Sequence, residues 1–427
     1  MQAERNGGIE SEAGLPHVLI VGSGFGGLSC AHALRDVPVR VTLVDRVNYH
    51  LFQPLLYEVA TAALGVDEIA ATTRMLFREQ RSVAIHMLTI ETIDIAARRA
   101  RTTEDHTLAY DWLVLAPGVV TDYFGHPEWA AHAPGLKTVE DALAVRRRVL
   151  LGFERAESEP DRERRRAHLT FVIVGGGATG VELAGAIGEM KNYTLRHEFR
   201  AIDPADARVL LLDAGERILP NFHPDLSART VLDLRRLGVE VQTGTLVTDV
   251  GQGFIVAGEE RISTSCVLWA AGTRGAPWLA SLGVSLDRQG RVLVGAGCAV
   301  PGHEEVFVVG DAAHYDDGAG GAPLPGVAQV AMQMGRHAAR CIADDIGKRP
   351  RRPFKYRDRG KLAVIGRGHA VCEIGPFKLA GLPAWLIWAF VHVMFLIGFR
   401  NRFVAMMEWA RTYFFQHRGG RFIIGDR

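Results

Sequence analysis

The feature that most restricts the fold of this chain is a glycine-rich turn close to its beginning. Residues His17–Val21 have the apolar composition of a buried strand, and the turn Gly22–Gly27 leads into a predicted helix over Leu28–Leu34. A second apolar strand over Val39–Val44 ends in Asp45. A strand, a GxGxxG turn, a helix, a strand and an acidic residue in this order form the unit that binds a dinucleotide.

Each residue of this unit has a separate physical role. Gly22 permits the tight turn, Gly24 lets the backbone approach a pyrophosphate, and Gly27 lets the helix pack close to the sheet. The helix N-terminus offers free N–H groups to the phosphates, and Asp45 can accept hydrogen bonds from a ribose. The turn alone does not say which dinucleotide it holds.

The same pattern returns in the middle of the chain. A strand over Leu169–Val174 precedes the turn Gly175–Gly180, a helix over Val181–Met190, and a strand over Arg208–Leu212 that ends in Asp213. Because the distance from turn to acid is longer than usual, an extended helix and a loop must fill it. Two such units in one chain indicate one tightly bound cofactor and one exchangeable dinucleotide.

Each unit also ends in a similar way. The apolar strand Tyr110–Ala116 runs into Pro117 and Gly118, and the apolar strand Cys266–Ala270 runs into Ala271 and Gly272. Residues 82–114 alternate as strands do, which predicts an antiparallel insertion followed by a return to the parallel sheet. The sequence therefore predicts an α/β fold with two Rossmann-like dinucleotide-binding domains.

Two later segments carry polar residues at informative positions. The strand Val306–Val309 is followed by Asp311, which can face a ligand crevice or cap a helix. The predicted helix Val327–Ile346 carries Gln329 and Gln333 on one face, which is either a ligand-facing pair or a solvated face.

Composition excludes several other classes. A length of 427 residues suggests two to three domains, and a net charge of +1 argues against a general nucleic-acid binder. The five cysteines are scattered without a CxxC motif, which predicts buried reduced thiols and neither a disulfide framework nor a zinc site. The lead-in Met1–Gly14 is polar, so no secretory signal is expected, and the mixed-charge run Arg155–Arg166 is interpreted as a solvated helix end or loop.

The last segment of the chain changes character. Leu379–Phe399 is nearly all apolar and rich in aromatics, but its helical part from Pro383 spans only about 24 Å, against about 30 Å for a bilayer core. An amphipathic helix is predicted over Phe403–Phe415, among several arginines. Apolar, aromatic and basic residues together predict a helix lying in an anionic membrane surface, with a dimer interface or an extra core helix as alternatives.

A family resemblance joins these features. Its motifs are Gly22–Gly27, Asn48–Leu56, Leu113–Gly118, Gly175–Gly185, Leu268–Gly272, Val308–Ala313, Ala328–Gln333 and the tryptophan-rich C-terminal region. On these residues the chain resembles the type II NADH dehydrogenases, which are single-subunit NADH:quinone oxidoreductases that do not pump protons. It departs from the family at Glu58, where glutamine is frequent, and at Thr273–Pro277.

The resemblance implies the cofactors and their residues. The first turn would bind FAD and the second NADH; Glu182 would lie near the nicotinamide, and Gln329 and Gln333 would face the flavin edge and the quinone. The implied catalytic residues are Glu182, Gln329 and Gln333. The implied cofactor-binding residues are Gly22, Gly24, Phe25, Gly26, Gly27, Asp45, Arg46, His50, Gln53, Ala116, Gly118, Gly175, Gly177, Thr179, Gly180, Glu182, Asp213, Ala271, Gly272, Asp311, Ala328 and Gln329. No metal site is expected.

The resemblance also implies an arrangement of domains. Residues 1–14 would be a disordered lead-in, 15–125 with 291–350 an FAD-binding domain, 126–290 an NADH-binding domain, and 351–427 a membrane-anchoring region. The expected partners are NADH, a membrane quinone and the membrane surface, with a homodimer allowed. The expected location is peripheral, at the cytoplasmic face of the cell membrane.

The implied reaction passes a hydride from NADH to the flavin and two electrons from there to a quinone. Water or Glu182 would relay the protons that the quinone takes up. Asp213 would repel a 2′-phosphate and so favours NADH, although Arg217 nearby leaves NADPH open. The alternatives are a soluble reductase of a protein electron carrier, a sulfide:quinone oxidoreductase, which would need paired redox-active cysteines, and an NADH- or FAD-binding sensor.

Overall fold

The computed structural model describes residues 14–316, 323–396, 404, 406, 407 and 421–423. The chain divides into two compact units. Unit 1 comprises Met1–His50, Thr72–Val120 and Arg274–Asp358, and unit 2 comprises Leu51–Ala71, Thr121–Thr273 and Arg359–Arg427. The sequence analysis instead assigned residues 51–71 to the FAD-binding domain and residues 351–427 to a separate region.

Unit 1 is built on a six-stranded sheet with the order β20-β21-β9-β1-β2-β5. Its strands are β1 His17–Val21, β2 Arg40–Asp45, β5 Val83–Met87, β9 Trp112–Leu115, β20 Ala299–Val300 and β21 His303–Val308. All neighbours are parallel except β20 with β21. Every residue of β1 is buried, as a continuous apolar run in a parallel sheet predicts.

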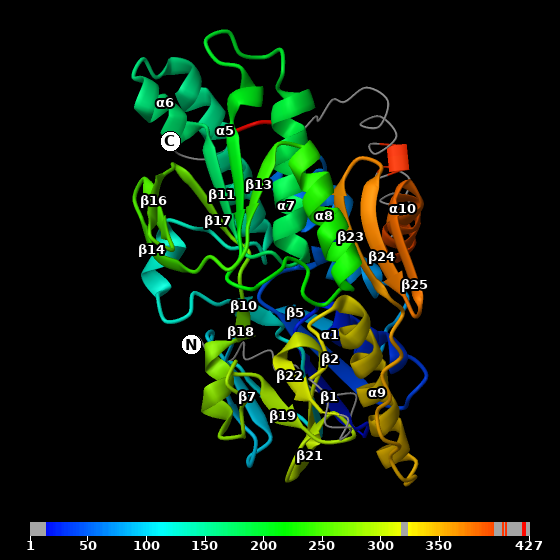
Figure 1. Ribbon diagram of the computed structural model, residues 1–427. Helices are drawn as coiled ribbons and strands as arrows, with labels where there is room; N and C mark the ends of the chain where they lie inside the picture. Colours follow the sequence, from blue (N-terminus) through cyan, green and yellow to red (C-terminus); the bar gives the residue numbers. More distant parts are fainter. Residues whose placement is uncertain (1–13, 317–322, 397–403, 405, 408–420, 424–427) are drawn as a thin grey trace, which may run out of the picture. The chain divides into compact units, whose positions relative to one another are not determined.

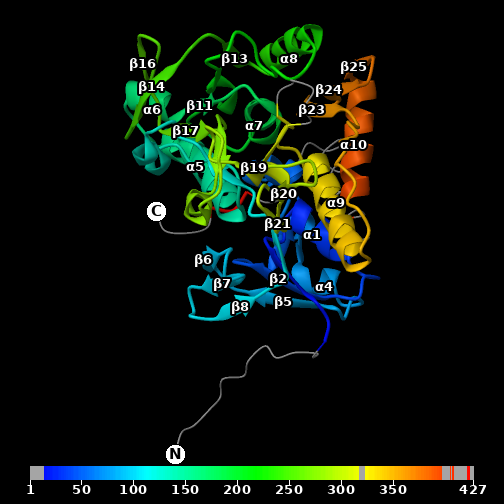
Figure 2. The ribbon, with the colours of Figure 1, turned by 90° about the horizontal axis from the view of Figure 1, so that it is seen from below.

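Two helices of unit 1 lie side by side, α1 Phe25–Ala33 and α9 Ala328–Ile346 (Figure 2). Their close approach depends on Gly335, because a Cβ there would lie 2.1 Å from the Gly26 carbonyl oxygen. Packing against α1 therefore holds the start of α9 beside the first glycine turn.

The predicted antiparallel insertion of unit 1 is confirmed. It consists of β6 Ile90–Asp94, β7 Arg99–Thr102 and β8 Thr107–Ala109, which pair in chain order. The smaller elements of this unit are α4 Thr73–Leu76, η5 Pro277–Leu282, β19 Val292–Val294, η6 Gly310–Ala312 and β22 Ala313–Tyr315. Four short strands lie where the chain passes between the units: β3 Tyr49–Leu51, β4 Ala70–Thr72, β10 Val119–Thr121 and β18 Thr273–Gly275.

Unit 2 contains a second parallel sheet with the order β13-β12-β11-β17. Its strands are β11 Thr170–Val174, β12 Arg208–Leu212, β13 Val239–Gln242 and β17 Cys266–Trp269. The accompanying elements are η1 Gln53–Leu55, α2 Leu56–Ala60, α3 Val66–Ile69, η2 Pro127–Ala131, α5 Val139–Ser158, α6 Arg162–His168, α7 Ala178–Glu189, η3 Met190–Thr194, η4 Pro204–Asp206, α8 Pro224–Arg236, β14 Val247–Gly251, β15 Phe254–Ala257 and β16 Glu260–Ser263. The long gap before Asp213 is filled by α7, η3 and a loop, as expected.

The mixed-charge run of unit 2 has a defined local structure. Its first residues complete α5. The helical spacing of Leu136–Val149 predicts a helix that starts at Leu136, but α5 begins at Val139 because Thr138 caps it by accepting a hydrogen bond from the Asp141 N–H. The remaining residues form α6, whose N-terminus is capped by Asp161 and which has no buried residue. The interpretation as a solvated helix end is confirmed.

The sequence analysis did not anticipate an antiparallel sheet in the C-terminal part of unit 2. Strands β23 Lys361–Gly366, β24 His369–Ile374 and β25 Phe377–Gly381 pair in order, and α10 Leu382–Phe395 packs along β24 and β25 (Figure 1). Strand β23 also packs on α7, where a Cβ on Gly185 would lie 1.8 Å from the Ile365 carbonyl oxygen. The predicted apolar helix is therefore 14 residues long and begins directly after a strand.

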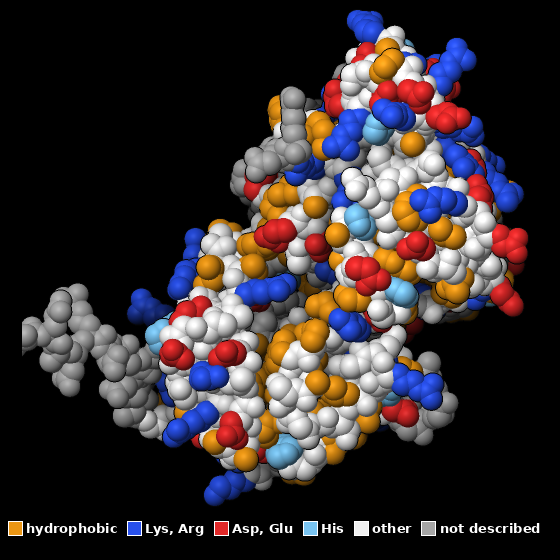
Figure 3. Space-filling model, turned by 90° about the vertical axis from the view of Figure 1, so that its left-hand side faces the viewer, with side chains coloured by type: hydrophobic (Ala, Val, Ile, Leu, Met, Phe, Trp, Pro, Cys, Tyr) orange, Lys and Arg blue, Asp and Glu red, His pale blue; other side chains and the backbone are white. Residues whose placement is uncertain are grey.

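No helix within the described residues has the length and apolar content to cross a bilayer. The predicted amphipathic helix Phe403–Phe415 and the lead-in Met1–Gly14 lie almost entirely outside the described residues. Figure 3 shows basic and acidic side chains interspersed on one face of the molecule, in keeping with the net charge of +1.

Candidate functional site

The first glycine turn of unit 1 has the geometry that its sequence predicts. Gly22 has a φ of +103°, and a Cβ there would lie 2.3 Å from the Ala116 carbonyl oxygen. A Cβ on Gly27 would lie 1.9 Å from the Gly22 carbonyl oxygen, so the helix can approach the turn only through a glycine. Gly24 is the N-cap of α1 and has no heavy atom within 4 Å of its Cβ position, so the space in front of the helix is open.

Asp45 fixes this turn from the end of β2. Its carboxylate accepts hydrogen bonds from the Ser23 N–H at 2.6 Å and the Ser23 hydroxyl at 2.8 Å. His50 is buried, and its Nδ1 hydrogen-bonds the Ser23 carbonyl at 2.9 Å. The edge of the His50 ring meets the Phe25 ring with centroids 5.0 Å apart. Arg46, in contrast, is exposed in the bend after β2.

The His50 imidazole leaves one atom for a ligand. Because the Ser23 carbonyl can only accept a hydrogen bond, Nδ1 carries the proton and Nε2 is an acceptor. Nε2 is buried and has no hydrogen-bond partner among the residues that the structure describes. Burial lowers the pKa of His50, which keeps the ring neutral. A buried acceptor of this kind fits a hydroxyl donor from a bound group.

Other expected residues of unit 1 lie at the same end of its sheet. Ala116 and Gly118, whose φ is +70°, follow β9, and Asp311 follows the neighbouring strand β21. The alternative of Asp311 as a helix N-cap is wrong, because Val309 holds that position in η6. A Cβ on Gly326 would lie 3.1 Å from the Asp311 carboxyl carbon, so the backbone at Gly326 passes close to this side chain.

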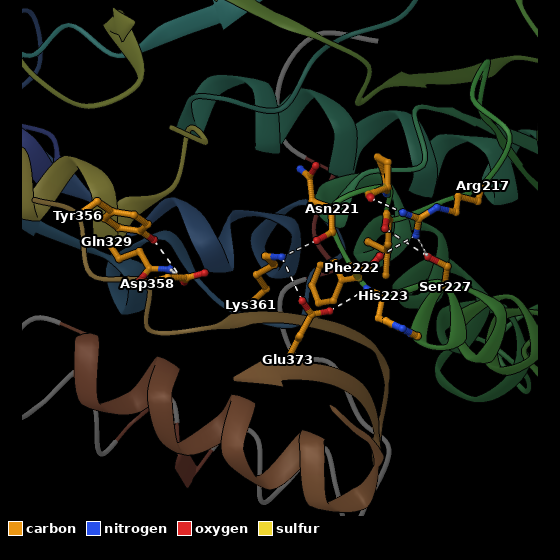
Figure 4. Close-up of polar contacts among 12 residues, drawn as sticks. Arg217, Asn221, Phe222, His223, Ser227, Gln329, Tyr356, Asp358, Lys361 and Glu373 are labelled. Atoms are coloured by element: carbon orange, nitrogen blue, oxygen red, sulfur yellow. Dashed lines mark hydrogen bonds and ion pairs between the residues drawn. The ribbon is translucent and has the colours of Figure 1, made fainter. Parts of the chain in front are cut away.

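The two glutamines of α9 have defined partners. Gln333 donates from Nε2 to the Arg357 carbonyl at 3.0 Å and accepts from the Arg357 N–H at 3.1 Å. Gln329 lies one turn earlier, next to Ala328 at the first position of the helix, and its Nε2 lies 3.4 Å from the Asp358 carboxylate, which Tyr356 also approaches (Figure 4). The pair is therefore not a freely solvated face, because it anchors the segment that follows the helix.

The second glycine turn repeats the first one in unit 2. Gly175 has a φ of +110°, and a Cβ there would lie 2.6 Å from the Ala270 carbonyl carbon. A Cβ on Gly180 would lie 1.8 Å from the Gly175 carbonyl oxygen, and Gly177 is an N-cap with open space in front of it. Thr179 lies in the first turn of α7. The three glycines of the GxGxxG pattern therefore occupy matching positions in the two turns.

Asp213 holds the second turn as Asp45 holds the first. It accepts hydrogen bonds from the Gly176 N–H at 2.5 Å and the Gly215 N–H at 2.7 Å. Arg217 donates to the Phe222 carbonyl at 2.7 Å, the Ser227 hydroxyl at 3.0 Å and a third acceptor, the Pro220 carbonyl (Figure 4). Its terminal nitrogens thus stabilise the loop before α8.

The remaining expected residues of unit 2 differ in their surroundings. Ala271 and Gly272, with a φ of +73°, follow β17 as Ala116 and Gly118 follow β9. Gln53 is exposed, and its amide donates to the Lys137 carbonyl at 3.0 Å. Its direct interaction is therefore with the segment before α5.

Glu182 lies on α7 beside two residues that the sequence analysis did not select. Tyr57 and Glu58, on α2, are buried, and the Tyr57 hydroxyl donates to the Glu58 carboxylate at 2.9 Å. Burial raises the pKa of Glu182 well above its usual value, and the Glu58 carboxylate raises it further. A single acidic residue inside the apolar run Leu55–Ala60 was the available sequence signal.

An apolar stripe runs along α10. Leu382, Leu386, Phe390 and Met394 recur every four residues and are all exposed, Phe390 at 67%. The opposite side of the helix is packed, with Trp388 buried and the His392 ring 6.1 Å from the Phe52 ring. This is the distribution of a helix that lies in an apolar boundary.

The five cysteines are all buried and free, as predicted. Burial raises the pKa of the Cys30 and Cys266 thiols to about 12. Since the thiolate is the reactive form, such thiols are inert at neutral pH. This disfavours a sulfide:quinone oxidoreductase that would use them.

Comparisons with known proteins cover most of the chain. The family described as pyridine nucleotide-disulphide oxidoreductase matches residues 16–335, and the family described as NDH2 C-terminal domain matches residues 359–418. The chain is 41% identical to the type II NADH:quinone oxidoreductase Ndh of Mycobacterium tuberculosis over 417 residues, covering 94% of this chain and 89% of that one. It is also 41% identical to NdhA of the same organism, covering 95% of this chain and 89% of that one.

Solved structures share the fold. NDH2 from Plasmodium falciparum in complex with NADH has a TM-score of 0.86 at 19% identity and covers 96% of this chain and 100% of its own. The sulfide:quinone oxidoreductase of Aquifex aeolicus has a TM-score of 0.72 at 19% identity, covering 94% of this chain and 96% of its own. At these identities the likeness concerns the fold alone.

Proposed function

The chain belongs to the type II NADH:quinone oxidoreductases, and from this membership we propose that it oxidises NADH through a bound FAD and reduces a membrane quinone. The family resemblance predicted from the sequence is confirmed by the matches at 41% identity. The observation that carries the proposal is the pair of glycine turns with matching geometry. In each turn, an aspartate at the end of a strand accepts a hydrogen bond from a backbone N–H of the turn. One turn serves a resident cofactor and its copy an exchangeable one.

FAD is assigned to unit 1. Three features support this assignment: the open N-terminus of α1, the unpartnered Nε2 of buried His50, and Asp311 at the end of a neighbouring strand. These residues fit a group with a pyrophosphate, ribose hydroxyls and a ribityl chain. Asp45 would orient the turn through its hydrogen bonds to Ser23. His50 Nε2 would accept a hydrogen bond from a hydroxyl group of the bound cofactor. A bound flavin supplies hydride acceptance and two-electron donation.

NADH is assigned to unit 2. Asp213 offers a carboxylate at the end of β12, where a ribose 2′-phosphate would be repelled. The guanidinium of Arg217, which could neutralise such a phosphate, instead donates to the Phe222 carbonyl and the Ser227 hydroxyl. Both features favour NADH over NADPH.

Glu182, Gln329 and Gln333 carry the remaining roles. Gln329 and Gln333 hold the segment after α9 in place and would position the quinone from that helix. Burial raises the pKa of Glu182, which favours its protonated form and makes its carboxyl a candidate proton donor during quinone reduction. NADH, one proton and the quinone give NAD⁺ and the quinol.

Attachment to the membrane is assigned to the stripe on α10. Its side chains are apolar and exposed, and the sequence that follows is rich in arginine, which suits anionic lipid headgroups. The proposed position is peripheral, on the cytoplasmic face.

The test is spectrophotometric. Purified protein should carry a flavin absorbance that NADH bleaches under anaerobic conditions and that a soluble quinone restores, while acid extraction should release FAD rather than FMN. A flavin-loaded protein that fails to oxidise NADH with quinone present would contradict the proposal. An absorbance that recovers only with a small iron–sulfur protein would favour the reductase of a protein carrier.

A further inference from the structure

A tight turn of unit 2 carries a phenylalanine at an unfavourable position. Phe124 and Gly125, its two central residues, have positive φ values of +51° and +95°. The turn is closed by a hydrogen bond of 3.0 Å from the His126 N–H to the Tyr123 carbonyl. These are features of a type I′ turn, whose central positions favour glycine, asparagine and aspartate. A phenylalanine in the left-handed region is strained, and Phe124 is 62% exposed, so burial of its ring offsets little of that strain.

Hydrogen bonds tie this turn to the end of strand β17. The Asp122 carboxylate accepts from the Phe124 N–H at 2.9 Å, and the Asp122 carbonyl accepts from the Trp269 indole N–H at 2.8 Å. The Asp122 N–H donates to the Gly272 carbonyl at 3.3 Å. The Tyr123 ring packs on the Trp269 ring, with centroids 5.3 Å apart. These contacts fix the position of the turn beside Gly272.

The Phe124 ring lies against Gly272. A Cβ on Gly272 would lie 2.4 Å from the Cζ atom at the tip of the ring, and 3.0 and 3.2 Å from its two Cε atoms. The ring therefore meets the strand end by its tip. The Trp269 ring is tilted by 54° with its centroid 6.4 Å away, so it does not stack on Phe124. Because most of the Phe124 surface is exposed, a flat face of its ring remains open to a ligand.

The end of β17 is also where one half of a dinucleotide would lie. Strands β12 and β17 flank β11 on opposite sides, and a dinucleotide binds across the crevice at such a change of strand order. Asp213 follows β12. The turn after β11 approaches the residues after β17, because a Cβ on Gly175 would lie 2.6 Å from the Ala271 nitrogen. With one ribose at Asp213, the other half of the dinucleotide extends past the glycine turn toward Gly272 and Phe124.

We propose that the open face of Phe124 supports the nicotinamide ring of NADH, and that the strained turn serves to place this face beside Gly272. This role rests on the proposed function, because it follows from the assignment of NADH to unit 2. An aromatic face suits both forms of the nicotinamide ring. The reduced ring can stack on it, and the positively charged ring of NAD⁺ is also attracted by the cation–π interaction. Phe124 is a binding residue that orients the ring and exchanges no proton or electron with it.

The test compares Phe124→Asn, Phe124→Tyr and a matched control, Leu246→Asn, in the flavin-loaded protein. Asn-Gly is a preferred pair for a type I′ turn, so Phe124→Asn removes the ring while it favours the backbone of the turn. Phe124→Tyr keeps the aromatic face. Leu246 also belongs to unit 2 and is exposed to the same extent as Phe124, at 62%. Its replacement therefore removes an equally exposed apolar side chain at another place.

Each variant is titrated by calorimetry with NAD⁺ and with ADP-ribose, and its melting temperature is recorded. ADP-ribose lacks only the nicotinamide ring, and neither ligand reduces the flavin. In Phe124→Asn the dissociation constant of NAD⁺ should rise about 2- to 10-fold. The affinity for ADP-ribose should stay the same, and the melting temperature should not fall. Phe124→Tyr and Leu246→Asn should bind both ligands as the wild type does.

An unchanged affinity for NAD⁺ in Phe124→Asn would overturn the proposed role of the ring. An equal loss of affinity for NAD⁺ and ADP-ribose would also overturn it, because the ring would then support the turn and not the nicotinamide. A wild type that binds neither ligand would overturn the assignment of NADH to unit 2, and the role of Phe124 with it. Binding requires no turnover, so a protein that shows the expected difference between the ligands but does not oxidise NADH with a quinone would overturn the proposed function alone.

Discussion

Replacing Gly180 by alanine should cut NADH binding while leaving the flavin bound. The new Cβ would lie 1.8 Å from the Gly175 carbonyl oxygen, whereas non-bonded atoms pack best at about 3.5 Å. The turn or the start of α7 must therefore move by more than about 1.5 Å. Such overpacking costs about 1–3 kcal/mol. Because NADH needs the native turn, the same free energy is lost from binding, and its dissociation constant should rise roughly 5- to 150-fold.

The assay is an anaerobic titration of the purified protein with NADH, with flavin content and melting temperature recorded for each variant. Gly27→Ala is the counterpart in unit 1, where the Cβ would lie 1.9 Å from the Gly22 carbonyl oxygen, and it should lose flavin. Gly297→Ala is the neutral control, because its Cβ would have no neighbour within 4 Å. An unchanged NADH affinity in Gly180→Ala would refute the steric reasoning, and loss of flavin from Gly180→Ala alone would reverse the assignment of the two turns.

Three further predictions concern the other parts of the proposal. Asp213→Asn removes the negative charge of the acceptor beside the second turn, so the KM for NADH should rise while the flavin is retained. An unchanged KM would count against the assignment of NADH to the second glycine turn. Phe390→Glu places a charge in the exposed stripe of α10 and should release the protein from anionic vesicles in a flotation assay, whereas Leu246→Glu, an exposed position outside the stripe, should not. The pKa of Glu182 is higher in the folded protein than in the unfolded chain. The free energy of unfolding that this shift contributes is therefore fully present below the unfolded pKa of about 4.3, and it falls as the pH rises toward the folded pKa. Melting temperatures of Glu182→Gln should therefore fall less than those of the wild type between pH 5 and 8, and parallel curves would contradict the raised pKa.

The sequence predicted those parts of the fold that local rules control. Both turns, both strand-end aspartates and the antiparallel insertion follow from glycine spacing and apolar periodicity, because a parallel strand buried on both faces leaves a continuous apolar run. Helix boundaries were less accurate, since capping by Thr138 moved the start of α5 by three residues.

The sequence analysis missed features that depend on contacts between distant segments. The placement of strands β23 to β25 depends on Gly185 of α7, which lies against the Ile365 backbone 180 residues away in the chain. Gln53 and His50 are three residues apart, yet one contacts the segment before α5 and the other contacts the Ser23 carbonyl. Neither contact leaves a pattern in the local sequence.

Glu58 shows how contacts between distant segments set the surroundings of a single residue. In the sequence it is one acidic residue within an apolar run, which ordinarily destabilises a core because a buried charge is costly. In the structure the Tyr57 hydroxyl donates a hydrogen bond to the Glu58 carboxylate at 2.9 Å and so reduces that cost. Glutamine would fill the same volume without a charge, so an acid at this position matters through the effect of its charge on Glu182 of α7, whose pKa it raises.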